Sequence, residues 1–165
     1  MPIHSYNANG CHAMDKTDLH ILQILQKKAR IPNVEVARTI GMAPSAVLER
    51  IKKLEASGII QGYEVRLNPE MFTCAMVAFV HIQVSDPACF DQTGNTLAAI
   101  DQVQEVHYLA GRDCLMAKLR VADNKELAHI LQTRINSIDA VVSTRTHIVL
   151  STFKESAKIM LTRII

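Results

Sequence analysis

Polar and basic side chains gather on one side of the segment 43–58, APSAVLERIKKLEASG. At about 100° per residue, Val47, Leu48, Ile51 and Leu54 fall on one apolar arc. A DNA major groove admits such a helix when the opposite arc carries groups that reach base edges and phosphates. A solvated amphipathic helix has the same pattern, so the neighbouring segments must decide. The opposite arc contains Ser45, Ala46, Glu49, Arg50, Lys52 and Lys53.

Two further short helices precede this segment. Asp15 and Asn33 are suited to cap helices that run to about Lys28 and Ile40, and Gly41 is suited to end the second. Three short helices with a glycine-containing turn before the last predict a helix-turn-helix. Residues 59–67 then have the pattern of a strand.

The second half of the chain changes its hydrophobic period. Strands are expected over residues 76–84, 103–110, 115–121 and 141–150, with helices over 90–100 and from the cap Asn124 to Ile138. The order β-α-β-β-α-β predicts a ferredoxin-like α+β sandwich with both helices on one face of the sheet. Apolar residues on both faces of the strands predict an oligomer that packs sheet to sheet. Residues 157–165 are expected to add a strand, with a short terminal helix as the alternative.

These patterns divide the chain into four parts. Residues 1–13 are expected to be a disordered extension and 14–62 a DNA-binding domain. Residues 63–73 would form a connecting strand or linker, and 74–165 an effector-binding and oligomerisation domain.

Positive charge is concentrated in the first part of the chain. The formal net charge is only +2, yet nine Lys/Arg residues stand against six Asp/Glu between residues 15 and 68. A monomer with this excess would bind phosphates weakly, whereas an oligomer that presents several copies would bind them more strongly.

Composition argues against several classes of protein. No apolar run approaches the roughly 18 residues of a membrane span. The four cysteines are widely separated, without a CxxC pair, which argues against a disulfide framework or zinc site and favours a reducing cytoplasm. Aromatic content of 4% without Trp disfavours single-strand binding by base stacking. No cofactor is expected.

Several residues could carry other chemistry. His81, His107 and His147 lie on expected strands without metal-ligand spacing, which favours interface or solvent-facing histidines over a metal site. Arg120 and Arg145 could meet a carboxylate ligand or an acid of a neighbouring subunit.

Several local strings support one family resemblance. They are ARIPNVEVARTIG, AVLERIKKLEASGIIQGY, LNP at 67–69, EVHYLAGRDCLMAKLRV and VVSTRTHIVL. Over residues 14–163 the chain resembles the leucine-responsive Lrp/AsnC family of transcriptional regulators. The resemblance implies a winged-helix-like DNA-binding domain and an ACT-like domain that binds an amino-acid effector. It also implies dimers that form through the C-terminal sheets and often assemble into octamers on promoter DNA.

The same resemblance assigns two sets of residues. Ser45, Ala46, Glu49, Arg50, Lys52 and Lys53 are expected to contact DNA. Ser45 and Glu49 lie at the centre of the polar arc, where Glu49 could read a base, and Lys52 and Lys53 are expected to bind phosphates. Arg50 is expected to contact a base, a phosphate or its own domain. The effector site is expected to comprise Gly111, Arg112, Asp113, Cys114, Asn124 and Ile148.

Two positions depart from the family pattern. Ala43 stands where relatives usually have a capping Ser, a loss of about 1 kcal/mol. Cys114 stands where relatives usually have an acid that could meet the ammonium group of an amino acid. Either Asp113 replaces it, or the ligand differs, or the protein binds none.

Two alternatives to an effector-gated regulator remain. One is an architectural DNA-binding protein that responds to no ligand, for which Cys114 is a hint. The other is an enzyme on the same scaffold, resembling tetrapyrrole decarboxylases, which would need a cluster of His, Arg and Tyr that the C-terminal half lacks. We therefore expect a protein that is not an enzyme.

Overall fold

The computed structural model describes residues 14–111 and 114–161, which divide into two compact units. Within the described residues, one unit comprises 14–66 together with 155–161, and the other comprises 67–154. The expected extension 1–13, the effector-loop residues Arg112 and Asp113, and the end of the last expected element at 162–165 lie outside the described residues.

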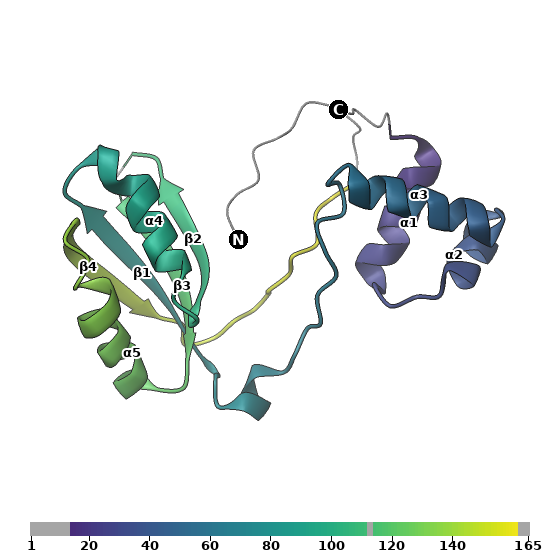
Figure 1. The fold of residues 1–165 in the computed structure, drawn as a ribbon. Helices are drawn as coiled ribbons and strands as arrows, with labels where there is room; N and C mark the ends of the chain where they lie inside the picture. Colours follow the sequence, from purple (N-terminus) through teal and green to yellow (C-terminus); the bar gives the residue numbers. More distant parts are fainter. Residues whose placement is uncertain (1–13, 112–113, 162–165) are drawn as a thin grey trace. The chain divides into compact units, whose positions relative to one another are not determined.

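The first unit is built on three helices, α1 (Lys16–Lys27), α2 (Asn33–Ile40) and α3 (Pro44–Ala56) (Figure 1). Asp15 caps α1 as predicted: its Oδ1 accepts from the Asp18 N–H at 2.8 Å, and Asp18 Oδ2 accepts from the Asp15 N–H at 3.1 Å. Gly41 ends α2 in the left-handed region, with φ of 72°. Apolar side chains of all three helices form the core: Ile21, Leu22, Leu25, Val36, Ala37, Val47, Ile51 and Leu54.

The second unit has the predicted βαββαβ order. It contains β1 (Met76–Val84), α4 (Phe90–Ala98), β2 (Val103–Leu109), β3 (Cys114–Val121), α5 (Asn124–Ile130) and β4 (Val141–Ile148). The four strands form one sheet in the order β2-β3-β1-β4, and every neighbouring pair is antiparallel. Short turns of 3₁₀ helix, η1 (Pro69–Phe72) and η2 (Pro87–Cys89), precede β1 and α4.

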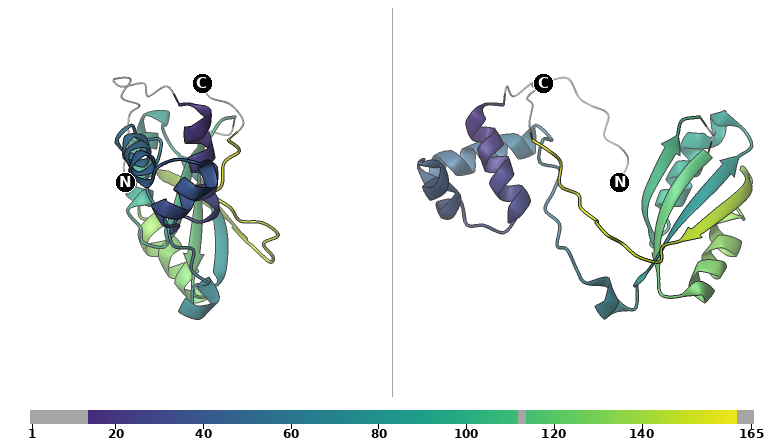
Figure 2. Two further views of the ribbon diagram at one scale, coloured as in Figure 1. Left: turned by 90° about the vertical axis from the view of Figure 1, so that its right-hand side faces the viewer. Right: turned by 180° about the vertical axis from the view of Figure 1, so that it is seen from behind.

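Helices α4 and α5 cover one face of this sheet (Figures 1 and 2). Alternate strand residues such as Val80, Ile82, Ala117 and Leu119 face them and are fully buried. The strand residues that alternate with these buried ones point to the opposite face of the sheet. There Phe79 is paired with Lys118 and His81 with Met116, and Phe79 and Met116 are only half-buried.

The caps of two helices differ from the prediction. Asn33 is the first residue of α2, and the preceding Pro32 caps it without a side-chain hydrogen bond. Asn124 is likewise the first residue of α5, because Asp123 accepts from the N–H groups of Lys125 at 2.8 Å and Glu126 at 2.9 Å. In both cases a residue one position earlier has the extended backbone that a cap requires.

Three expected elements are shorter or absent in the described chain. Residues 59–67 form no paired strand, since no described segment hydrogen-bonds to them as a neighbouring strand. Residues 157–161 have no regular secondary structure. The last helix changes after Ile130 into one turn of π-helix, η3 (Leu131–Ile135), and does not reach Ile138. The described residues include no helix that is long and apolar enough to cross a membrane.

Candidate nucleic-acid interface

Helix α3 has one buried and one accessible face. Val47, Ile51 and Leu54 point into the core of the first unit. The residues predicted to contact DNA lie together on the opposite, accessible side, because positions three and four apart share a helix face. Ser45, Glu49, Lys52 and Lys53 are exposed, and Ala46 and Arg50 are half-buried.

The turn before α3 is fixed by backbone geometry. After Gly41, the Met42 N–H donates to the Ala37 carbonyl at 3.0 Å. Ala43 has the extended conformation of a helix cap, with φ of −69° and ψ of 139°, yet makes no side-chain cap bond. Pro44 follows at the start of the helix, where its missing N–H costs nothing. As the sequence predicted, the N-terminus of α3 therefore lacks a side-chain cap.

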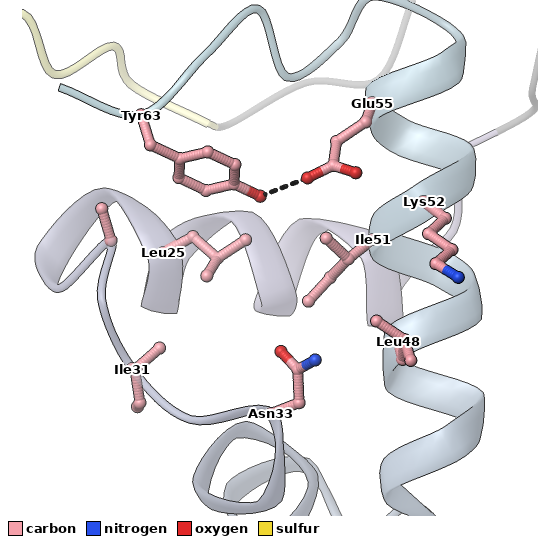
Figure 3. Close-up of a pocket in the computed structure, with 9 residues that line it drawn as sticks. Leu25, Ile31, Asn33, Leu48, Ile51, Lys52, Glu55 and Tyr63 are labelled. Carbon is pink, nitrogen blue, oxygen red and sulfur yellow. Dashed lines mark hydrogen bonds between the residues drawn. The ribbon is translucent and has the colours of Figure 1, made fainter.

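Leu48 differs from the predicted arc, because its side chain is 40% exposed. It lines a cavity of about 280 Å³ together with Leu25, Ile31 and Ile51 (Figure 3). Tyr63 spans one side of this cavity, and its hydroxyl donates to Glu55 Oε1 at 2.8 Å. Leu48 is therefore at the border of the core.

The hydroxyl of Tyr63 has an altered acidity. Burial, followed by the neighbouring Glu55 carboxylate, raises the pKa of Tyr63 to about 12. The hydrogen bond links α3 to the chain that follows it, so this residue positions the helix end.

Arg50 joins α3 to the beginning of α1. Its Nη1 donates to Asp15 Oδ2 and to Asp18 Oδ1, each at 2.8 Å. The Asp18 side chain is 1% exposed, and that of Arg50 is 29% exposed. Hydrogen bonds from Arg50 to Asp18 and then Asp15 raise the pKa of the guanidinium. The Asp18 N–H is the largest cause that lowers the pKa of Asp15, and Arg50 lowers it further.

This ion pair gives Arg50 the intra-domain contact that was one of its expected roles. A contact of Arg50 with DNA stays a prediction. Sequence reasoning missed the pairing, although the spacing of Asp15 and Asp18 has the pattern of a capping box. That spacing places two carboxylates together at the beginning of α1, where a cation of another helix can meet both.

The accessible face of α3 can therefore do two kinds of chemistry. Glu49 and Ser45 offer groups that accept hydrogen bonds from base edges. Lys52 and Lys53 are exposed ammonium groups that can bind phosphates without reading sequence.

The four predicted effector residues that the structure describes lie in two places within the chain. Gly111, with φ of 87°, and Cys114 lie at the turn between β2 and β3. Ile148 lies level with Leu119, because both pair with Ala78. Five residues separate Cys114 from Leu119, which is roughly 16 Å along a strand. Asn124 follows β3 at the same far end. The described members of the set therefore lie towards two ends of the sheet, and their role in effector binding stays a prediction.

Cys114 is the first residue of β3 and is 4% exposed. It is paired with Gln83 of β1 and Leu109 of β2. At this turn end of a central strand the buried Cys114 thiol is a packing residue, and it carries no negative charge for an ammonium group.

The three histidines of the strands each lie close to another side chain. The rings of His81 and His147 meet edge to face at 5.5 Å between centroids. His107 Nε2 lies 3.3 Å from Glu105 Oε2, and Lys118 Nζ donates to Glu105 Oε1 at 3.0 Å. Within residues 14–111 and 114–161, no three His, Cys, Asp or Glu side chains are grouped to hold a metal ion.

Both units match known protein families. Residues 77–159 match the Lrp/AsnC ligand binding domain, and residues 14–61 match the winged helix-turn-helix DNA-binding family. The leucine-responsive regulatory protein of Haemophilus influenzae is 33% identical over 146 residues, which cover 87% of this chain and 88% of that protein.

Solved structures show the same arrangement of elements. Escherichia coli AsnC has a TM-score of 0.81 at 26% identity and covers 90% of this chain and 98% of its own. A transcriptional regulator of Neisseria meningitidis, solved as a complex with L-methionine, has a TM-score of 0.84 at 26% identity and covers 90% and 97%.

Proposed function

The chain belongs to the Lrp/AsnC family of DNA-binding transcriptional regulators, and we propose that α3 is the helix by which it reads promoter DNA. The observation that supports this is the division of α3 into a buried apolar face and an exposed face with Glu49, Lys52 and Lys53. The helix-turn-helix would place α3 in the major groove, and paired subunits would meet half-sites about one helical turn apart.

In this proposal the exposed residues divide their roles. Glu49 and Ser45 contact base edges, Ala46 allows close approach, and Lys52 and Lys53 bind phosphates. Arg50 holds α3 against α1 through its bonds to Asp15 and Asp18, so that the contact residues keep a fixed orientation. Any phosphate contact of Arg50 would be additional to that role.

The proposed effector is a small molecule of the amino-acid class. The support is the family match over residues 77–159 and the methionine complex of the related Neisseria regulator. Because the predicted effector residues lie at both ends of the sheet, the ligand would be held between chains, at an interface of the assembly. Gly111 with Asp113 would contribute from one chain, and Asn124 with Ile148 from another.

We further propose a dimer that packs through the uncovered face of the sheet. Phe79 and Met116 lie near the middle of this face among charged residues, as expected for an apolar centre with a polar rim. Dimers would assemble further, up to an octamer. The protein would work in the cytoplasm, and its three described cysteines are free thiols. No catalytic role is proposed.

The DNA-binding roles can be tested with matched lysine variants. DNA from upstream of the protein's own gene is titrated with Lys53→Ala and with Lys125→Ala, which removes an exposed lysine of α5. Lys53→Ala should weaken binding on all sequences and reduce the salt slope by about one unit, while Lys125→Ala should match the wild type. A slope that Lys53→Ala leaves unchanged would contradict the phosphate role.

The effector proposal has its own test. Sedimentation and thermal shift are measured with each of the twenty amino acids. A ligand that raises the melting temperature and changes the assembly supports an effector-gated regulator, because a ligand shifts an equilibrium only by its differential affinity for two states. If none has an effect, the architectural DNA-binding role becomes the better interpretation.

A further inference from the structure

The C-terminal segment of the chain is part of the helical unit at the opposite end of the sequence. Residues 155–161 cluster with 14–66, while the intervening 67–154 form the sheet unit. The Ile159 N–H donates to Gln26 Oε1 of α1 at 3.0 Å, across 133 positions of sequence. Leu161 packs against the core cluster formed by α1, α2 and α3.

Only one apolar side chain at this end of the segment is covered. Leu161 is half-buried, whereas Met160 is 84% exposed and Ile159 is 71% exposed. The Lys158 N–H donates to Ser156 Oγ at 3.2 Å, which constrains the chain just before the contact. Within residues 158–161, the Ile159 N–H and the Leu161 side chain contact the helical unit.

The helical unit has a physical need for such a contact. Its core comprises eight buried apolar residues from three short helices. Domains of about 60 residues or fewer bury a smaller fraction of their surface than larger domains do, and they are correspondingly marginal in stability. An added leucine on the border of so small a core contributes a substantial part of its stability.

We propose that residues 158–161 are a structural part of the DNA-binding unit, and that Gln26 with the adjoining core border is their docking site on α1. Residues 149–154 then connect β4 to this docking site, in addition to the connection from α3 to β1. The strands β1 and β4 are hydrogen-bonded neighbours in the sheet. Each of them is therefore connected to the helical unit by its own stretch of chain, β1 through the residues after α3 and β4 through residues 149–154. This inference goes beyond the proposed function and requires neither DNA nor effector.

Amide hydrogen exchange of the full chain, followed by mass spectrometry, tests the docking site. Leu161→Asp is compared with Met160→Asp, which places the same charge on the adjacent, exposed position. We expect Leu161→Asp to speed exchange in α1, α2 and α3 about tenfold, with β1 and β3 unchanged. Met160→Asp should exchange like the wild type throughout.

A milder pair of variants tests the hydrogen bond. Gln26→Ala removes the acceptor of the Ile159 N–H, and Gln23→Ala is the control because Gln23 is exposed on the same helix. Faster exchange of the Ile159 amide and of α1 in Gln26→Ala, but not in Gln23→Ala, supports the docking site. Equal exchange of the helices in Leu161→Asp and Met160→Asp would overturn the inference, and so would equal effects of the two glutamine variants. Since exchange is read without DNA, the result is independent of whether the proposed DNA contacts are correct.

Discussion

Replacing Arg50 with Met removes the cation that joins α3 to the capping box of α1 while keeping most of the apolar stem. Removing one partner of a fully buried ion pair costs about 3–5 kcal/mol, whereas exposed pairs contribute about 1 kcal/mol or less. The Asp18 side chain is 1% exposed, but Arg50 is 29% exposed. An intermediate loss of about 2 kcal/mol in the free energy of unfolding is therefore expected for the helical unit.

The assay combines urea unfolding with DNA titration. Circular dichroism at 222 nm follows the loss of helix, and DNA affinity is measured over a series of salt concentrations. Arg50→Met should lower the stability of the helical unit but leave the salt slope unchanged, because Arg50 is bonded to Asp15 and Asp18. Asp18→Asn should show the same behaviour, and the double variant should lose less than the sum of the two.

The opposite pattern would refute this reasoning. If Arg50→Met lowers the salt slope by about one unit and leaves unfolding unchanged, then Arg50 is a phosphate contact. A pH series adds an independent check. The pKa of Asp15 lies below its ordinary value of 3.8, chiefly because of the Asp18 N–H and in part because of Arg50. Stability from this group is therefore present above about pH 4 and lost as the pH falls through the lowered pKa, and Arg50→Met should weaken that dependence.

Three further outcomes are expected from single substitutions. Ala43→Ser supplies the missing cap of α3 in a suitable backbone conformation and should raise thermal stability by about 1 kcal/mol; an unchanged melting temperature would contradict the cap geometry. Tyr63 should titrate near its pKa of about 12 in ultraviolet difference spectra, so its hydrogen bond contributes stability below pH 10 that is lost as the pH rises towards 12. Tyr63→Phe should remove that step, and an ordinary tyrosine titration in the wild type would argue against the bond to Glu55. Lys118 holds the pKa of Glu105 below 4.5, so stability from this pair is lost as the pH falls through the lowered pKa. Thermal melts at pH 3–6 should be less pH-dependent in Glu105→Gln, and equal slopes would exclude the ion pair as a source of acid sensitivity.

The order and type of the elements could be predicted because they depend on residues close together in sequence. The 3.6-residue period of α3 and the alternation of β1 and β3 are visible in the side chains themselves. The caps show the limit of such local patterns. Asp15 has the expected role, but at α2 and α5 the capping position precedes the predicted Asn by one residue.

The predicted strand over residues 59–67 shows a different limit. Alternating apolar side chains indicate an extended backbone, but a strand also needs a neighbour that offers hydrogen bonds. In this segment Val65 is 82% exposed and Leu67 is 61% exposed. The alternation therefore predicted a strand, but the described part of the chain supplies no neighbouring strand to pair with it.

The sequence by itself determined the family, the order of the helices and strands and the accessible face of α3, because these follow from periodicity and local strings. The tertiary structure decided which side chains and backbone groups form contacts between segments that are far apart in sequence. Arg50 meets Asp18 across 32 positions, and Ile159 meets Gln26 across 133. It also placed Gly111 and Cys114 towards one end of the sheet and Asn124 and Ile148 towards the other. Contacts between distant segments depend on how whole elements pack, and no pattern within a few residues encodes that packing.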